Sequence, residues 1–194
     1  MKRIALLAIA ALALTLFAPA LLAQEEHGEF GVFFDYTRLH HFNDANLVGV
    51  GGQLAFNLNK FVQLEGSMAY DFERNVTSTI PGGATTSFSP SGLRLLNGMF
   101  GPKFQTGIGP VKAYVTVKGG FLNFGVSNRG VATGFANQIG TVTDGDTNGV
   151  IYPAGGIELF THHIGIRVEA GDFMYFDNGV NHNLKASIGP QIRW

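Results

Sequence analysis

Ten charged residues occur in segments where polar and apolar residues alternate. In a β-strand successive side chains point to opposite faces, so these charges would share one face of a sheet. If that face encloses a narrow interior, the charges are expected to pair, because a buried unpaired charge is costly. The predicted ionic set comprises Asp35, Glu65, Lys103, Lys112, Lys118, Glu158, Arg167, Glu169, Lys185 and Arg193.

The sequence offers little for nucleophilic or nucleotide-dependent catalysis. His182 and Ser187 are five residues apart, which places them on opposite faces of a regular strand. The sequence has no Gly-x-Ser-x-Gly motif, the turn that exposes a hydrolytic serine. The run Gly49-Val-Gly51-Gly52 lacks the third glycine and the following helix of a dinucleotide site. We therefore expect no enzymatic activity, no catalytic residue and no cofactor.

Two groups of residues could bind a metal ion. The segment 144–149 (Asp-Gly-Asp-Thr-Asn-Gly) matches the first half of a calcium loop, but Gly155 stands where the bidentate glutamate belongs. His40, His41 and His182 would lie at the outer rim, where the first and last strands meet. We expect polar loop and rim residues at both places, with calcium or a weak histidine site as the alternatives.

The clearest alternation is in the last eleven residues, which predict a strand over 184–194. Its apolar row ends on an aromatic residue, as does the lipid-facing row of a transmembrane barrel strand. The segment resembles the C-terminal strand of outer-membrane β-barrels, which their assembly machinery recognises. The expected assembly signal consists of Leu184, Ile188, Ile192 and Trp194.

The same alternation recurs along the chain and predicts eight strands, separated by turn residues. Short connections at 59–60, 106–110 and 161–163 alternate with mostly longer ones, including polar loops at 73–92 and 124–149. An eight-stranded antiparallel up-and-down transmembrane β-barrel follows, with the longer loops outside the cell. The expected strands are 30–39, 47–58, 61–72, 93–105, one starting at 111, 150–160, one starting at 164, and 184–194.

Three prolines and one irregular segment argue against regular strands along the whole chain. Pro102, Pro153 and Pro190 fall inside predicted strands, where each removes a ladder donor. Frayed or bulged strand ends are expected to accommodate Pro102 and Pro190, whereas Pro153 has no such explanation. A bulge is expected after Asp172.

The N-terminus carries an export signal. Residues 1–23 have a short basic start, an Ala/Leu-rich run and a small residue before Gln24, which predicts a secretory signal peptide cleaved after Ala23. The barrel domain is then 24–194. Loss of Lys2 and Arg3 takes the formal charge from −1 to −3, which gives no basic bias towards nucleic acid. With no cysteine, stability must come from the sheet.

Signal peptide, strand pattern and aromatic terminus together resemble the OmpA-like and OmpX-like outer-membrane β-barrel family. The most similar pieces are 98–104, 155–159, 166–169 and the terminal strand. The resemblance implies a barrel in the outer membrane of a Gram-negative-type bacterium. The chain ends with the barrel, so we expect it to lack the peptidoglycan-binding domain of larger family members. The resemblance therefore does not imply anchoring to the cell wall.

These observations predict a non-enzymatic, monomeric barrel with a structural or surface-interaction role through its outer loops. Expected partners are outer-membrane lipid, lipopolysaccharide, the assembly machinery, and an extracellular ligand or host surface. The main alternative is a small gated pore, since the ionic set could gate a lumen as well as fill it. Further alternatives are a lipid-A-modifying barrel enzyme, and a soluble exported lipid-binding barrel with its polar face outward.

Overall fold

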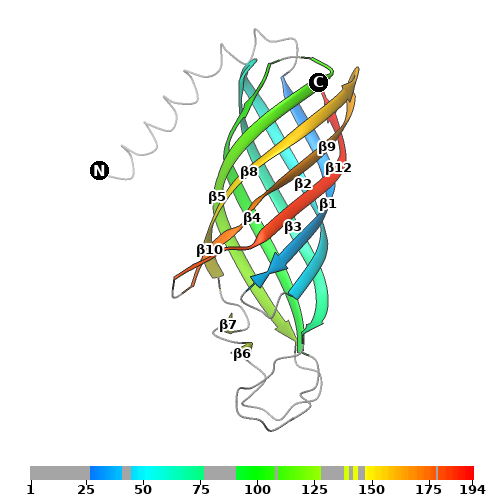
Figure 1. Ribbon diagram of the computed structural model, residues 1–194. Helices are drawn as coiled ribbons and strands as arrows, with labels where there is room; N and C mark the ends of the chain where they lie inside the picture. The colour runs from blue at the N-terminus through cyan, green and yellow to red at the C-terminus, as the bar shows by residue number, and fades with distance from the viewer. Residues whose placement is uncertain are drawn as a thin grey trace, which may run out of the picture.

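The computed structural model describes residues 27–40, 45–76, 91–107, 109–127, 138–139, 142–143, 147–177 and 179–194. Eight long antiparallel strands close into a tilted barrel (Figure 1), which confirms the predicted fold class. In order around the barrel they are β1 (Gly28–Leu39), β2 (Ala45–Asn59), β3 (Val62–Val76), β4 (Ser91–Gln105), β5 (Val111–Ser127), β8 (Thr147–Thr161), β9 (Ile164–Asp172) and β12 (Leu184–Arg193).

The described residues also include four short strands. β6 (Gln138–Ile139) and β7 (Val142–Thr143) pair with each other. β10 (Met174–Phe176) continues the line of β9, and β11 (Val180–Asn181) precedes β12. We call the end with the connections 60–61, 106–110 and 162–163 the turn end, and the opposite end the loop end.

The two faces of the sheet differ sharply, because the strand period of two separates apolar from polar positions. On β1, Phe34 is 69% exposed while the neighbouring Asp35 is 3% exposed. On β9, Ile166 and Val168 lie outside while Arg167 lies inside. The apolar rows face outward on all eight long strands, and the predicted charged positions, apart from Arg193, are buried in the interior.

The strands near the loop end are longer than expected. β3 continues to Val76 and β4 begins at Ser91, so the predicted loop 73–92 is partly strand. Likewise β5 continues to Ser127 and β8 begins at Thr147, which shortens the predicted loop 124–149. Polar composition misled the prediction here, since paired strands that extend beyond the apolar belt need no apolar row.

The three prolines stay within paired strands, and each interrupts the ladder on one side only. Pro102 pairs with Leu64 of β3, but the β4–β5 register omits it. Pro190 pairs with Ile166 of β9, and the β1–β12 register omits it. The expected frayed or bulged ends were therefore wrong. A residue in an antiparallel ladder directs its N–H to a single neighbour, so a proline costs one pairing and leaves the other intact.

The expected bulge after Asp172 was also wrong. β8 pairs with β9 up to Ala154↔Gly171 and resumes with Ile151↔Met174 of β10, which is the same register. The break lies beside Pro153, which pairs with Val117 on its other side. A missing donor interrupts this ladder, and no residue is inserted.

The chain closes the barrel with its two terminal strands. β1 pairs with β12 from Glu29↔Arg193 to Arg38↔Leu184. Beyond β12, the Trp194 amide donates to the Gly28 carbonyl at 3.1 Å, and the Gly28 amide donates to the Trp194 carbonyl at 3.2 Å. The indole lies against Gly28, where a Cβ would be 2.8 Å from a ring carbon. The last residue is thus part of the closing seam.

The predicted signal peptide lies outside the described residues. Within the part of the chain that the structure describes, no helix is long and apolar enough to cross a membrane.

Gly189, the residue before Pro190, lies where β12 approaches β1 closely. A Cβ there would lie 1.9 Å from the Val32 carbonyl oxygen and 2.5 Å from the Phe33 Cα. We expect Gly189→Ala to lower the free energy of unfolding by about 1–3 kcal/mol, because backbone must shift to admit the methyl group. The measurement is urea unfolding of the refolded barrel in lipid vesicles.

Gly119→Ala is the matched control. A Cβ at Gly119 would find its nearest neighbour at 3.8 Å, in ordinary contact. Alanine there is expected to be neutral or slightly stabilising, since it restricts the unfolded chain. Equal unfolding free energies for the two variants would contradict the close approach.

Candidate functional site in the barrel interior

Arg167 is the centre of a buried group of charges in the half of the interior nearer the turn end. Its guanidinium donates to both oxygens of Glu65, at 2.5 and 3.0 Å, and to Glu169. Glu158 lies 3.5 Å from the same guanidinium. Lys118 bridges Glu65 and Glu169 at 2.6 and 2.9 Å. These five side chains come from β3, β5, β8 and β9, so they join strands on different sides of the barrel.

A second branch reaches the turn end through Glu29. Its carboxylate lies 3.0 Å from the Lys103 ammonium and 3.2 Å from that of Lys112, and Lys103 also pairs with Glu158. Glu29 was missed in the sequence because the first strand was started at Phe30. Extending the alternation by one residue would have included it. The observed ionic network consists of Glu29, Glu65, Lys103, Lys112, Lys118, Glu158, Arg167 and Glu169.

The other three members of the predicted ionic set lie elsewhere. Lys185 and Asp35 form a separate buried pair, and the Lys185 ammonium also donates to Thr37 at 3.4 Å. Arg193 is half-buried at the turn end, and its Nε donates to the His162 carbonyl at 2.6 Å. Arg193 therefore helps to hold the 162–163 turn against β12.

Aromatic rings cover the buried cations. The Tyr114 ring lies 4.5 Å from the Arg167 guanidinium and 4.9 Å from the Lys103 ammonium. The Tyr114 hydroxyl accepts from Arg167 at 2.7 Å and donates to Glu169 at 2.9 Å. Lys185 lies 5.2 Å from the Phe173 ring. Such contacts stabilise charges that have left water.

The interior nearer the loop end is apolar, which the sequence analysis did not foresee. Eleven buried side chains pack together there, with the Phe124 and Tyr175 rings edge-to-face at 5.5 Å and the Tyr152 and Phe173 rings at 6.1 Å. This apolar layer consists of Leu39, Leu47, Leu93, Leu95, Met99, Leu122, Phe124, Val150, Tyr152, Phe173 and Tyr175. The interior thus has an ionic half and an apolar half.

The structure does not bring the residues considered for hydrolysis together. His182 is exposed and its Nδ1 lies 2.6 Å from an Asp172 carboxylate oxygen. Ser187 points to the other face of β12, between the inward-facing Lys185 and Gly189. The glycine run 49–52 lies within β2 and is followed by more strand.

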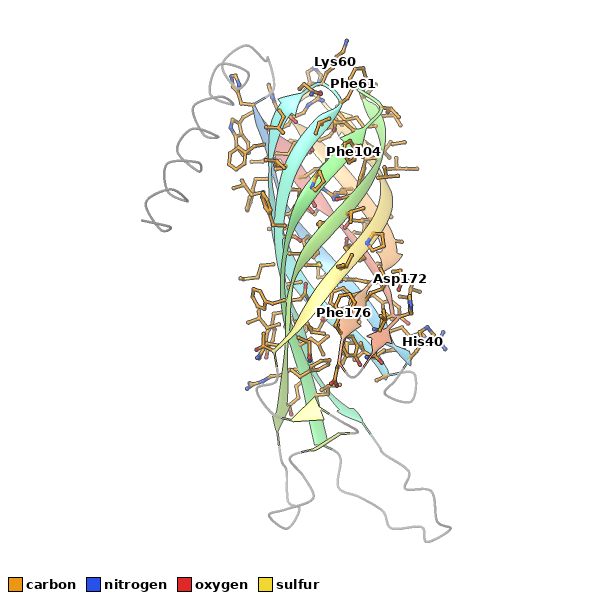
Figure 2. The ribbon with its side chains drawn as sticks, turned by 90° about the vertical axis from the view of Figure 1, so that its left-hand side faces the viewer. His40, Lys60, Phe61, Phe104, Asp172 and Phe176 are labelled. Atoms are coloured by element: carbon orange, nitrogen blue, oxygen red, sulfur yellow. The ribbon has the colours of Figure 1, made fainter. Side chains whose placement is uncertain are left out.

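The metal candidates are only partly within the described residues. Among those, no group of three or more His, Cys, Asp or Glu side chains could hold a metal ion. His40 is exposed near the loop end (Figure 2), and its amide donates to the Asn183 side chain at 3.1 Å. His41, Asp144 and Asp146 lie outside the described residues, whereas Gly155 is in β8.

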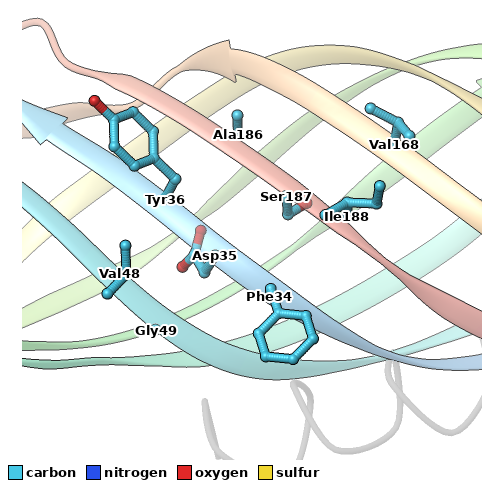
Figure 3. A pocket seen from close by; sticks show the side chains of 9 residues that line it. All are labelled: Phe34, Asp35, Tyr36, Val48, Gly49, Val168, Ala186, Ser187 and Ile188. Atoms are coloured by element: carbon cyan, nitrogen blue, oxygen red, sulfur yellow. The ribbon is translucent and has the colours of Figure 1, made fainter.

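A hollow of about 490 Å³ lies on the outside of the barrel, over β1, β2 and β12 (Figure 3). The small side chain of Ala186 leaves space between larger neighbours such as Tyr36 and Ile188. The Tyr36 hydroxyl, which lines it, donates to Asn46 at 2.7 Å. The rest of its outward lining is apolar, namely Phe34, Val48, Val168, Ala186 and Ile188.

Comparison with known proteins supports the fold. No family model matches the sequence, and no curated protein is similar to it at a significant level. Among solved structures, the chain is similar to Ail, the attachment invasion locus protein of Yersinia pestis, in complex with the heparin analogue sucrose octasulfate. Identity is 14% over 88% of this chain and 100% of that one, with a TM-score of 0.58.

Two further structures are similar at slightly lower TM-scores. Neisserial surface protein A is 9% identical over 88% of this chain and 98% of its own, with a TM-score of 0.55. The outer membrane protein OprG from Pseudomonas aeruginosa is 11% identical over 87% of this chain and 97% of its own, also at 0.55. At these identities the comparisons show the shared barrel fold.

The ionic network predicts a large effect for Glu65→Gln. The change leaves Lys118 and Arg167 buried without one of their carboxylates, so unfolding free energy should fall by about 3–5 kcal/mol. Glu73→Gln is the control, because Glu73 is exposed on the same strand and its loss should cost about 1 kcal/mol or less. Urea titration of both refolded variants measures the difference, and similar losses would contradict the network.

Proposed function

We propose that this chain is a non-enzymatic barrel protein of the outer membrane of a Gram-negative-type bacterium. It is exported by residues 1–23 and acts as a structural or surface-interaction protein through its loop end. The observation that carries the proposal is the apolar outer surface. Phe34, Phe100 and Val115 are 60–69% exposed on three different strands. Lipid is the solvent in which such a surface is stable, and a soluble barrel needs the opposite arrangement.

The loop end is the part we propose to meet partners outside the cell. Segments 77–90 and 128–146 connect the longest strands there, whereas the turn end has only short connections. Ail was solved with a sulfated heparin analogue, but these two segments contain a single basic residue, Arg129. We therefore propose an uncharged extracellular ligand or host surface, contacted through the Thr-, Ser- and Gly-rich segments.

A small gated pore remains the alternative of a different class. The ionic network and the apolar layer both occupy the interior, and an eight-stranded barrel leaves little room beyond its side chains. An ion that crossed would have to separate Arg167 from Glu65 and displace the Phe124–Tyr175 contact. This filling favours the surface-interaction role, and single-channel recording in planar bilayers would distinguish the two.

A lipid-A-modifying enzyme is less well supported. The hollow over Ala186 is open to lipid, yet its outward side chains are apolar apart from the Tyr36 hydroxyl. His182 lies before the start of β12 and pairs with Asp172, whereas Ser187 faces inward on β12. This arrangement lacks an activated nucleophile beside an acyl chain.

Protease treatment of intact cells tests membrane location and orientation together. Proteinase K should cut within 77–90 or 128–146, because connecting loops outside the membrane are its accessible sites. Fragments are identified by mass spectrometry, and a periplasmic protein that stays intact is the control. Cutting only after the outer membrane is opened would reverse the orientation, and absence from the membrane fraction would favour the soluble barrel.

The terminal strand is proposed to be the assembly signal, with Leu184, Ile188, Ile192 and Trp194 all exposed on its outer face. Trp194→Phe keeps an aromatic ring at the membrane interface, so near-normal outer-membrane levels are expected. Trp194→Asp should leave the protein in the periplasm, where it is degraded. The measurement is the outer-membrane fraction at equal synthesis. Normal insertion of the Asp variant would show that the row is no assembly signal.

A further inference from the structure

One buried carboxylate, Asp71, has no cationic partner among the described residues. The buried cations Lys103, Lys112, Lys118, Arg167 and Lys185 each lie in an ion pair with another carboxylate. Six buried carboxylates face these five cations, which leaves one negative charge unmatched. The half-buried Arg193 does not supply the balance, because it lies at the turn end and Asp71 lies towards the loop end. The side chain of Asp71 is 0% exposed.

A second carboxylate faces Asp71 across one strand. Asp35 of β1 and Asp71 of β3 both pair directly with Gly49 of β2. A Cβ on Gly49 would lie 2.8 Å from Oδ1 of Asp71, so the Asp71 carboxylate lies over this glycine, towards Asp35. Lys185 binds Oδ2 of Asp35, which leaves Oδ1 of Asp35 and both oxygens of Asp71 without a hydrogen-bond partner among the described residues.

One more unpartnered side chain, that of Asn97, lies near Asp71. Asn97 of β4 is 0% exposed, and it pairs with Ala69, two residues before Asp71. Neither the oxygen nor the nitrogen of the Asn97 amide has a hydrogen-bond partner within the described residues. Buried polar groups are nearly always satisfied, so the shared deficit of Asp35, Asp71 and Asn97 points to a bound species.

We propose that a monovalent cation, sodium or potassium, binds in the barrel interior between Asp35 and Asp71, with Asn97 as a neutral oxygen donor. Hard cations are bound by carboxylate and amide oxygens such as these. With Lys185 included, the group carries one net negative charge, which one monovalent ion neutralises. A divalent ion would leave an excess positive charge, and the described residues hold no cluster of three metal-binding side chains.

The site lies between the two halves of the interior. Asp71 pairs with Leu95, a member of the apolar layer that covers the loop end. On the other side, Asp35 pairs with Ser187, and Ser187 pairs with Glu169 of the ionic network. The cation therefore completes the charge balance where the ionic half meets the apolar half, in a place shielded from bulk water.

Cation-dependent stability tests the proposal. The barrel refolded in neutral lipid vesicles is unfolded by heat in sodium, potassium or choline chloride at one ionic strength and at pH 8. The thermal unfolding midpoint of the wild type should be higher in sodium or potassium than in choline. This increase in the midpoint, the cation gain, should rise with the logarithm of ion concentration, as for a single bound ligand. In Asp71→Asn this gain should disappear, with a midpoint in choline at or above that of wild type.

Glu73→Gln is the matched control, because it removes an exposed carboxylate from the same strand and should keep the full cation gain. A proton on Asp71 is the competing explanation, and infrared spectroscopy detects it as a protonated carboxyl band. A wild-type midpoint independent of the cation would overturn the proposal. So would a protonated carboxyl band in sodium chloride that Asp71→Asn removes. The wild-type comparison of sodium, potassium and choline stands even if the Asn variant fails to fold.

Discussion

The pairing of β1 with β12 is the constraint on which the rest of this structure depends, because it turns an open sheet into a closed one. An edge strand in lipid would leave a row of backbone donors and acceptors unsatisfied. Closure brings both ends of the folded domain to the turn end, where Trp194 and Gly28 exchange hydrogen bonds. It also creates an interior so narrow that inward side chains from opposite strands must meet. The Arg167–Glu65 contact, between β9 and β3, exists only because the sheet closes.

Filling that interior with charge requires a near-complete set of partners. A buried guanidinium is stable only where carboxylates and rings replace its water, and Arg167 has Glu65, Glu169 and the Tyr114 ring. The lysines follow the same rule, with Lys118 between two carboxylates and over the Tyr152 ring. These contacts tie β3, β5, β8 and β9 to one another across the lumen. The interior is therefore a second set of connections between strands, in addition to the backbone ladder.

Alternation made most of the fold predictable, because the period of two is strict wherever one face is apolar and the other polar. All eight strands and their faces follow from it. Alternation does not predict the interior where both faces of a strand are apolar, and this explains why the apolar layer was missed. Inward residues such as Leu95 and Leu122 have the same character as the outward-facing Leu96 and Phe121. Proline placement was unpredictable for another reason. Each residue directs its N–H to one neighbouring strand, and which neighbour that is depends on the alternation of hydrogen-bonded and non-hydrogen-bonded pairs in the ladder. The sequence alone does not contain this information.

The barrel and its loop-end connections differ in how much change they tolerate. The network around Arg167, the apolar layer and the closing seam are coupled sets of contacts, so a substitution in any of them affects neighbours on several strands. Segments 77–90 and 128–146 join strand ends that the ladder already pairs, as β3 with β4 up to Val76↔Ser91 and β5 with β8 up to Asn123↔Thr147. Their length can change with little effect on closure, because the entropic cost of closing a loop rises only slowly with its length. A surface role carried by these segments is therefore compatible with a fixed, filled barrel, whereas a role carried by the lumen would require the least changeable part of the molecule to move.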